Sequence, residues 1–453
     1  MSKPSIPQGT RDFSAETVRK RNYIFNTIRN TFELFGFEPL ETPAMENLET
    51  LMGKYGEEGD RLIFKILNNG LGDPKNAEKA KEGFEKVMEG KNSSLLTERA
   101  LKYDLTIPFA RYVAMNFGQL TLPYKRYQIQ PVWRADRPQK GRYREFTQCD
   151  ADVVGSPSLL NEIELAGIYH MVFTQLRLND YSLKINNRKI LAGLAQICGG
   201  AEKLTDITIA IDKLDKIGID KVKQELEQRG LTAQQIDTIA SYLFVTGSNQ
   251  EKLEKMSIML AKDSIAQEGI QELTTIIEQT PGINIEVDFT LARGLNYYTG
   301  AIFEVKAPDA VKMGSIGGGG RYDDLTGLFG VSGIAGVGIS FGVDRIYDVL
   351  EELSLFPADL QTSTKALFFN LGQKENQFAY PIMMSLRTQG ISCELYHESA
   401  KLDKQFKYAE KKKIGYAVII GSNEMDSGQA VVKNLSNGMQ QTVAIQQLYE
   451  ALS

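Results

Sequence analysis

The stretch Trp133–Asp152, WRADRPQKGRYREFTQCDAD, constrains the fold of this chain most strongly. Two segments, Tyr124–Val132 directly before this stretch and Glu145–Val154 at its end, alternate polar with apolar residues and contain side chains that favour strands. Between these two segments, Pro138 restricts one φ angle and Gly141 permits a reversal of the chain. The pattern therefore predicts an antiparallel hairpin with a long loop.

The predicted hairpin loop is basic. Guanidinium groups pair with phosphate oxygens through parallel hydrogen bonds, and strands hold such groups more rigidly than a loop does. Charge alone does not distinguish an anion-binding hairpin from an exposed one, because runs of charged residues usually face water. The alternatives are thus an anion-binding hairpin and an exposed charged one. The residues concerned are Arg134, Arg137, Lys140, Arg142 and Arg144, with Asp136 and Glu145 among them.

Composition narrows the class of protein. A chain of 453 residues with 42% hydrophobic and 24% charged residues is typical of a soluble protein with two or three domains. It has no apolar run long enough to cross a membrane and no signal-peptide core, so we expect a cytoplasmic protein. The three cysteines are far apart in the sequence and form no C-x-x-C pair, which argues against a cysteine zinc site. The chain has only two histidines, which argues against histidine-based catalysis. These residues are Cys149, Cys198, Cys393, His170 and His397.

The N-terminal region predicts a helix followed by extended chain. Ser14–Phe35 has apolar residues at helical spacing, with Ser14 suited to the N-cap and Gly36 to the stop. The prolines of Phe37–Pro43 favour an extended backbone. This helix and strand belong either to the core, which the pattern favours, or to a dimer interface.

The next segments alternate between ordered elements and connections. Leu62–Leu67 predicts a strand, and residues 68–94 predict a long connection with at most a helical turn at 77–88. Asp104 precedes an apolar stretch, where its simplest role is a helix cap. Leu159–Leu178 has the spacing of a helix.

Residues 191–279 predict a separate helical insertion, after which the chain returns to strands. Residues 283–306 predict strand, turn and strand, with Arg293–Asn296 as the turn and Tyr297 and Tyr298 opening the second strand. Four consecutive glycines, Gly317–Gly320, lack the Gly-Lys-Ser/Thr of a phosphate loop. They predict close approach of the backbone to a ligand or between strands.

The C-terminal third has two parts. Ile334–Phe341 predicts a buried strand, and a helix follows it as far as Leu353. Beyond Pro357, short strands and helices alternate. This pattern predicts a separate α/β module at residues 364–453.

Together these segments resemble the class II aminoacyl-tRNA synthetases, and specifically the histidyl-tRNA synthetase family. Gly36–Pro43 is similar to motif 1 of the class, Arg134–Phe146 to motif 2 and Gly336–Arg345 to motif 3. Leu291–Gly300 (LARGLNYYTG) and Gly317–Leu325 (GGGGRYDDL) are similar to segments of the histidyl branch. The resemblance covers nearly the whole chain.

The resemblance implies an α+β fold. Residues 1–186 and 282–356 would form a catalytic domain around a six-stranded antiparallel sheet, with a helical insertion domain at 187–281. Residues 364–453 would form an α/β anticodon-binding domain. The motif 1 region would form the interface of a homodimer.

The resemblance also implies the chemistry. The family uses ATP, with Mg²⁺ bound through the ATP phosphates and not by protein cysteine or histidine. It converts histidine to histidyl-adenylate and transfers the histidyl group to tRNA(His). By position, the catalytic residues would be Arg134, Arg293 and Arg345. The ATP site would consist of Arg134, Asp136, Arg142, Phe146 and Arg345.

The remaining contacts follow from the same resemblance. Gln139 and Lys140, at the hairpin tip, would contact the tRNA acceptor end. The alternative function is the non-catalytic regulatory paralogue of histidine biosynthesis, a partner of ATP phosphoribosyltransferase that typically lacks the C-terminal module. The histidine site would consist of Asp104, Thr106, Arg134, Gln148, Asp152, Arg293, Tyr297, Tyr298 and Tyr322.

Overall fold

The computed structural model describes residues 3–292, 297–361 and 364–453.

The alternating segments of the hairpin form two long strands. Strand β5 (Tyr124–Trp133) pairs antiparallel with β6 (Glu145–Val154). At the tip, Gln139 and Arg142 exchange backbone hydrogen bonds, and Gly141 has a φ of +70°. The predicted hairpin is confirmed, including the role of its glycine.

The hairpin belongs to an eight-stranded sheet with the order β1-β5-β6-β11-β10-β9-β7-β8. The six central strands pair antiparallel, whereas β1 and β8 pair parallel at the two edges. The expected six-stranded antiparallel sheet is therefore confirmed, with one short strand added at each edge. The other strands are β1 (Glu38–Pro39), β7 (Ser182–Asn187), β8 (Ile285–Val287), β9 (Ala301–Lys306), β10 (Gly317–Arg321) and β11 (Gly336–Gly342).

The structure corrects the expected start of the second strand in residues 283–306. β9 begins at Ala301, so Tyr297 and Tyr298 precede the strand and do not open it.

β7 lies between β8 and β9 in the sheet. Parallel neighbours need a crossover connection, and the helical insertion between β7 and β8 provides it. The predicted turn, Arg293–Asn296, lies outside the described residues.

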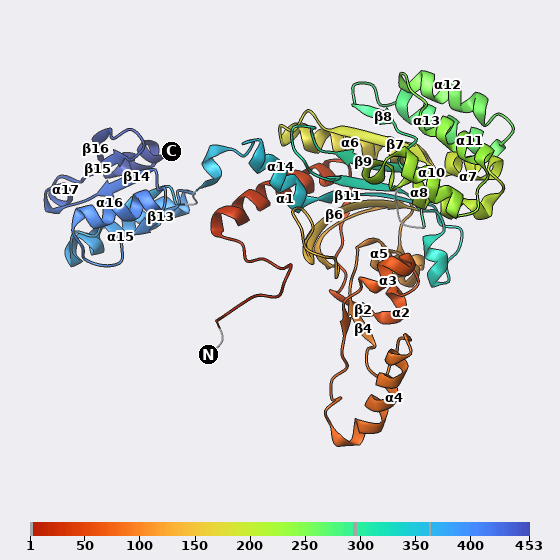
Figure 1. Cartoon of the computed structure of the whole chain (residues 1–453). Helices are drawn as coiled ribbons and strands as arrows, with labels where there is room; N and C mark the ends of the chain where they lie inside the picture. The colour runs from red at the N-terminus through yellow and green to blue at the C-terminus, as the bar shows by residue number, and fades with distance from the viewer. Residues whose placement is uncertain (1–2, 293–296, 362–363) are drawn as a thin grey trace. The chain divides into compact units, whose positions relative to one another are not determined.

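One face of the sheet is apolar and is covered by α1 (Ala15–Leu34) and α6 (Leu160–Gln175), as Figure 1 shows. The ring of Phe341 on β11 lies 5.9 Å from that of Phe32 on α1. It lies 4.8 Å and 5.7 Å from the rings of Tyr169 and Phe173 on α6. Burial of each such side chain stabilises the fold by about 1.5–3 kcal/mol.

The predicted ends of α1 are confirmed. The Ser14 hydroxyl accepts a hydrogen bond from the backbone N–H of Thr17 at 3.3 Å. Gly36 has a φ of +74°, and the N–H of Phe37 donates to the carbonyl of Phe32 at 3.0 Å, which closes the helix.

A smaller sheet with the order β2-β4-β3 precedes the hairpin in the chain. Residues 77–88 form a helix of 12 residues, α4, and not a single turn in a connection. It is anchored because Gly83 packs closely on Leu96, where an added Cβ would lie 2.8 Å from that side chain. The predicted strand at 62–67 is only two residues long. The elements are β2 (Met45–Asn47), α2 (Leu48–Leu51), α3 (Gly56–Arg61), β3 (Lys65–Ile66), α4 (Ala77–Met88), β4 (Arg99–Leu101) and α5 (Thr106–Asn116).

The insertion is helical, as expected. Thr232 and Ser248 each cap a helix, and their backbone N–H groups donate return hydrogen bonds to the side chains of Gln235 and Glu251 respectively. Within the described residues, no helix is both long and apolar enough to cross a membrane. The helices are α7 (Arg188–Ile197), α8 (Leu204–Ile211), α9 (Leu214–Ile217), α10 (Ile219–Gln228), α11 (Ala233–Leu243), α12 (Asn249–Met259) and α13 (Ser264–Glu278), and α14 (Val343–Glu352) follows β11.

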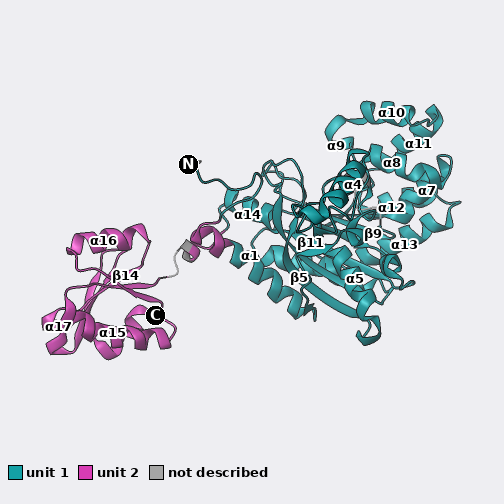
Figure 2. Cartoon of the chain, turned by 90° about the horizontal axis from the view of Figure 1, so that it is seen from below, with its two compact units in different colours: residues 1–12, 21–355 teal, residues 13–20, 356–453 magenta. Residues whose placement is uncertain are grey.

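The chain divides into two compact units, Met1–Asp12 with Arg21–Leu355 and Phe13–Lys20 with Phe356–Ser453 (Figure 2). The second contains a sheet with the order β13-β12-β14-β15-β16, whose first three strands are parallel. The predicted α/β module is confirmed, although α17 was not predicted. Its elements are β12 (Ala366–Phe368), α15 (Gln373–Thr388), β13 (Cys393–Leu395), α16 (Leu402–Lys411), β14 (Tyr416–Ile419), α17 (Ser422–Ser427), β15 (Gln429–Asn434), β16 (Gln440–Ala444) and α18 (Leu448–Leu452).

The glycine run of β10 permits close packing of backbones. A Cβ at Gly319 would lie 2.1 Å from the carbonyl oxygen of Gly338, whereas at Gly318 the nearest atom would be 3.3 Å away. Gly319→Ala should therefore destabilise the unit that contains the eight-stranded sheet by about 3 kcal/mol, and Gly318→Ala by less than about 1 kcal/mol. Urea unfolding followed by the fluorescence of Trp133 measures both. Equal midpoints for the two variants would contradict the packing argument.

Candidate active site

A cleft of about 300 Å³ opens beside the hairpin, on the sheet face opposite α1 and α6. Residues from the hairpin, from β10 and from the start of α14 form its walls. The structure brings all five predicted ATP residues into this one cleft, together with Gln148. The six are Arg134, Asp136, Arg142, Phe146, Gln148 and Arg345.

Arg134 directly follows β5 and is held from several sides. Its Nε donates to the carbonyl of Tyr103 at 3.0 Å, and its guanidinium lies 4.3 Å from the Tyr103 ring centroid and 5.2 Å from that of Phe146. Its Nη2 lies 3.5 Å from Oε1 of Gln148. The cation is therefore fixed in position before any anion arrives, which is the arrangement that stabilises developing phosphate charge.

Arg345 reaches the cleft from the first turn of α14. Its Nε donates to the carbonyl of Gly141 at 2.8 Å and its Nη1 to that of Ser315 at 2.6 Å. Arg142, at the hairpin tip, lies 3.8 Å from the Asp136 carboxylate. Three guanidinium groups thus surround one cleft, a charge pattern suited to a polyphosphate.

A cluster of buried and partly buried acidic and tyrosine side chains, which we call the acidic pocket, adjoins the cleft; its members are Asp104, Asp152, Tyr297, Tyr298 and Tyr322. Asp152 of β6 is 2% exposed, forms an ion pair with Arg126 at 2.9 Å and accepts a hydrogen bond from the Tyr322 hydroxyl. Burial raises the pKa of Asp152 above its ordinary value, and the Arg126 charge opposes only part of that rise. A buried carboxylate beside tyrosine hydroxyls can both accept and donate hydrogen bonds, as recognition of a polar ring requires.

Asp104 lies in the same pocket and also caps a helix. Its Oδ1 accepts hydrogen bonds from the Tyr55 hydroxyl at 2.9 Å and from the N–H of Ile107, in the first turn of α5, at 3.2 Å. Among the described residues its buried Oδ2 has no hydrogen-bond partner. The two interpretations of Asp104, helix cap and pocket residue, are therefore compatible.

Aromatic side chains complete the pocket. The Tyr297 ring lies 5.2 Å from that of Tyr298 and 6.1 Å from that of Tyr322. Burial and the neighbouring Asp104 raise the pKa of Tyr297, and the nearby Thr106 hydroxyl opposes that shift. The structure thus brings together the predicted histidine-site residues of α5, β6 and the segments that precede β9 and follow β10.

Three predicted residues lie apart from this pocket or cannot be placed. Arg293 lies outside the described residues. Gln139 and Lys140 lie at the hairpin tip, where Lys140 is paired with Glu352 at 3.0 Å and its side chain is 64% exposed. The tip is therefore accessible to a large partner.

Known proteins match this chain along its length. A model of the histidyl-tRNA synthetase family matches residues 78–346, and a model of the anticodon binding domain matches residues 365–453. The chain belongs to the histidyl-tRNA synthetase family.

Relatives in this family span the whole chain. A histidine–tRNA ligase of Bacteroides fragilis is 53% identical over 458 residues, which cover 100% of this chain and 99% of the relative. One of Christiangramia forsetii is 53% identical over 455 residues and 99% of each chain. The crystal structure of histidyl-tRNA synthetase from Nostoc sp. PCC 7120 has a TM-score of 0.85 and 32% identity, covering 100% of this chain and 99% of that one.

Sequence reasoning missed two charged residues of the hairpin. Arg126 and Asp150 are 0% and 2% exposed, and both point to the same sheet face as Gln148 and Asp152. Residues two apart on a strand share a face, so the alternation of β6 already contained the signal for Asp150. Arg126 is found only from the register, which sets it opposite Asp152.

The N-terminal segment was also missed. The carbonyl of Gly9 accepts from the N–H of Arg144 at 2.9 Å. The Arg11 guanidinium lies 3.2 Å from the Tyr143 ring centroid and pairs with Asp344 at 2.6 Å. Because Tyr143 and Asp344 line the cleft, Arg11 holds two of its walls together. A short polar segment without periodicity gives no sequence signal for such a role.

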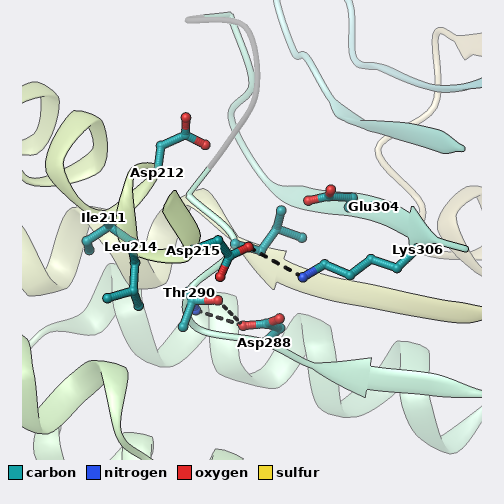
Figure 3. Close-up of a pocket in the computed structure, with 9 residues that line it drawn as sticks. Ile211, Asp212, Leu214, Asp215, Asp288, Thr290, Glu304 and Lys306 are labelled. Carbon is teal, nitrogen blue, oxygen red and sulfur yellow. Dashed lines mark hydrogen bonds and ion pairs between the residues drawn. The ribbon is translucent and has the colours of Figure 1, made fainter. Parts of the chain in front are cut away.

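A second pocket lies where the insertion meets the sheet edge (Figure 3). Its space of about 20 Å³ is that of a single water molecule, so it is not a substrate site. Asp215 of α9 pairs with Lys306 of β9 at 3.6 Å, while Thr290 donates to Asp288. The Asp215–Lys306 pair connects the insertion to the sheet, whereas the Thr290–Asp288 contact orders the segment that follows β8.

Arg11→Ala should weaken ATP binding by about fivefold to tenfold, because the cleft walls lose their common tie while the phosphate-facing arginines remain. Isothermal titration calorimetry with ATP measures the change. Lys3→Ala removes a positive charge from an exposed position of the same segment and serves as the control. Equal ATP affinities for the two variants would exclude this role for Arg11.

Proposed function

We propose that this protein is a histidine–tRNA ligase that activates L-histidine with ATP and transfers the histidyl group to the 3′ end of tRNA(His). The observation that carries the proposal is the junction at Arg134 of an arginine-lined cleft with an acidic, tyrosine-walled pocket. The relatives that match the whole chain carry the name of this activity.

In the first step, a carboxylate oxygen of histidine attacks the α-phosphorus of ATP. The new P–O bond forms as the bond to the β-phosphate oxygen breaks, giving histidyl-adenylate and pyrophosphate. Arg134 and Arg293 would hold the α-phosphate and the substrate carboxylate, and Arg345 the γ-phosphate. Phe146 would stack on adenine, with Asp136 and Arg142 as further ATP contacts. Positioning and charge stabilisation suffice for this reaction, so no covalent protein intermediate is needed.

Specificity for histidine would come from the acidic pocket. The imidazole ring would lie between Asp152 and Tyr298, close to Tyr322. Asp104, Thr106 and Gln148 would surround the α-amino group, with Tyr297 beside Thr106. An amino acid without two ring nitrogens would leave buried groups unpaired, which is worth about 10⁴-fold in discrimination.

ATP is expected to arrive with Mg²⁺. The carboxylate of Asp136 lines the cleft and offers the oxygen donors that Mg²⁺ accepts, so the site fits the ion. Most of its ligands would be phosphate oxygens and water. When bound, the ion would neutralise part of the charge that develops on the phosphates.

The second step requires the tRNA acceptor end at the same site. Gln139 and Lys140 at the exposed hairpin tip would contact it. The catalytic domain would consist of residues 1–186 and 282–356, with the insertion domain at 187–281. The protein would act in the cytoplasm as a homodimer joined through motif 1, and the exposure of Leu34 (72%) and Met45 (49%) on either side of that motif supports such an interface.

The module at residues 364–453 would bind the anticodon. β12 lies between the parallel strands β13 and β14, and its alternate residues pack against α15 on one face and α16 on the other. Such sheets bind ligands at the carboxyl end of the strand where the connections change sides. A cavity lies there, lined by Asn370, Asn376, Gln377 and Tyr380.

The side chains of this cavity suit nucleobases. Asn370 is 5% exposed, and the Oδ1 atoms of Asn370 and Asn376 are buried without a hydrogen-bond partner among the described residues. Amides can pair with base edges, and the ring of Tyr380, a residue that is 51% exposed, can stack on a base.

The regulatory paralogue is not favoured. The chain retains the C-terminal module together with Arg134, Arg142 and Arg345. A structure of an ATP phosphoribosyltransferase regulatory subunit/histidyl-tRNA synthetase from Bacillus halodurans has a TM-score of 0.72 at 19% identity, covering 90% of this chain and 97% of that one. That likeness supports the fold alone.

The function is tested by pyrophosphate exchange into ATP with each of the twenty amino acids. We expect exchange with histidine only, because the buried Asp152 and Tyr322 require a polar ring. Exchange with no amino acid would favour the regulatory paralogue. Exchange with a different amino acid would overturn the assignment of the pocket.

Asn370→Ala and Tyr380→Ala should each raise the KM for tRNA(His) about tenfold, since each loses one amide–base or stacking contact of about 1–3 kcal/mol. Histidine-dependent exchange should stay unchanged, because the cavity belongs to the C-terminal module. Tyr449→Ala removes a tyrosine that is 40% exposed from α18 of the same module and serves as the control. Aminoacylation kinetics that match the control would exclude the cavity as the anticodon site.

A further inference from the structure

Asp150 is a buried carboxylate for which the proposed reaction has no role. It lies on β6 between Gln148 and Asp152 and is 2% exposed. It has no ion-pair partner among the described residues, unlike Asp152, which pairs with Arg126. A buried unpaired carboxylate is costly, so its presence calls for a functional explanation.

The contacts of Asp150 lead to the cleft through two side chains. Nε2 of Gln148 donates to Oγ of Ser340 at 3.0 Å and lies 3.5 Å from Oδ1 of Asp150. Ser340 is the direct partner of Asp150 in the register of β6 with β11, so its side chain lies beside that carboxylate on the same face of the sheet. Gln148 and Ser340 line the cleft, whereas Asp150 is not part of its wall.

The protonation state of Asp150 sets the direction of these hydrogen bonds. An ionised carboxylate only accepts, so the Ser340 hydroxyl donates to it and receives the amide N–H of Gln148 on its own oxygen. This arrangement leaves Oε1 of Gln148 pointing at Arg134, 3.5 Å away. An oxygen in that position can accept a hydrogen bond from an ammonium group.

We propose that Asp150 is a positioning residue of the amino-acid site, which acts through Ser340 to keep the carbonyl oxygen of Gln148 directed towards the α-ammonium group of histidine. The inference rests on the proposed function, in which Gln148 contacts that group. It adds a residue that never touches the substrate.

The same relay makes histidine binding depend on pH. Burial raises the pKa of Asp150 to about 7, against an ordinary value of 3.8. When Asp150 is protonated it donates to Ser340, whose hydroxyl then turns to Oε1 of Gln148 and withdraws it from the substrate. The charged and titratable groups around Asp150 are Arg126, Asp152, Asp104, Lys102, Cys149, Tyr169 and Tyr298.

The test compares the wild type with Asp150→Asn in histidine-dependent pyrophosphate exchange between pH 6 and pH 8. At pH 8 the variant should have a histidine KM raised about tenfold with kcat changed less than about threefold. At pH 6 most Asp150 is protonated in the wild type, so the ratio of the two KM values should approach one. The ratio cancels the titration of histidine itself, which affects both proteins equally.

Two further variants keep the test decisive. Asp180→Asn makes the same charge change at an exposed position and should match the wild type at every pH. Ser340→Ala removes the relay but keeps the carboxylate, and it should also raise the histidine KM at pH 8. Its KM ratio to the wild type should likewise decline at pH 6.

Stability separates this role from a structural one. Folded Asp150 has the higher pKa, so the wild-type free energy of unfolding falls as pH rises from about 4 to about 7. The Asp150→Asn variant has no carboxyl group to ionise at this position, so it lacks this decrease in the free energy of unfolding. It should have a higher melting temperature than the wild type at pH 8, although it binds histidine more weakly.

The outcomes are distinct. A KM ratio that stays near one, or that does not change with pH, overturns the role of Asp150 while the proposed function stands. A loss confined to kcat overturns it too. A wild type without histidine-dependent exchange at any pH refutes the proposed function, and the inference falls with it.

Discussion

A strand places successive side chains on opposite faces of its sheet, and β6 shows how much of this protein depends on that constraint. Cys149, Ala151 and Val153 point into the apolar core beneath α1 and α6, and each is at most 1% exposed. Gln148, Asp150 and Asp152 point the other way, towards the cleft and the acidic pocket. A slip of one residue in register would bury three polar groups in the core and destroy both sites.

Burying the polar face of the sheet costs free energy. Burial raises the pKa values of Asp104, Asp150 and Asp152, which means that the ionised forms lose more hydration than their partners replace. Arg126 is fully buried and forms its ion pair over the ring of Phe109, 4.2 Å away. Buried ion pairs rarely add net stability, so the apolar face of the same strands has to offset their cost. The pattern is that of a site organised for a cationic, hydrogen-bonding substrate.

Local signals predicted most of the fold. The hairpin, α1 with its cap at Ser14 and stop at Gly36, and the α/β module depend on neighbouring residues, and all were predicted. The position of β7 between β8 and β9 was not, because a parallel pair depends on a crossover of nearly a hundred residues that no local pattern encodes. Likewise the pair of Arg11 and Asp344 joins residues 333 positions apart. The resemblance to a family gathered the cleft residues into one site, but it left out Asp150, whose contacts lie behind the cleft wall.

The glycines of β10 and β11 explain why the pocket can exist in a close-packed sheet. A Cβ at Gly338 would lie 2.0 Å from Oδ1 of Asp152, and one at Gly336 would lie 2.5 Å from the Tyr322 ring. At Gly320 it would lie 3.0 Å from the ring of Tyr298. The long side chains assigned to imidazole recognition therefore occupy space that their neighbours leave empty. Two sequence features that look unrelated, a polar alternation on one strand and glycine on the next two, are parts of one requirement. Buried recognition groups need room, and in a sheet only the absence of adjacent side chains provides it.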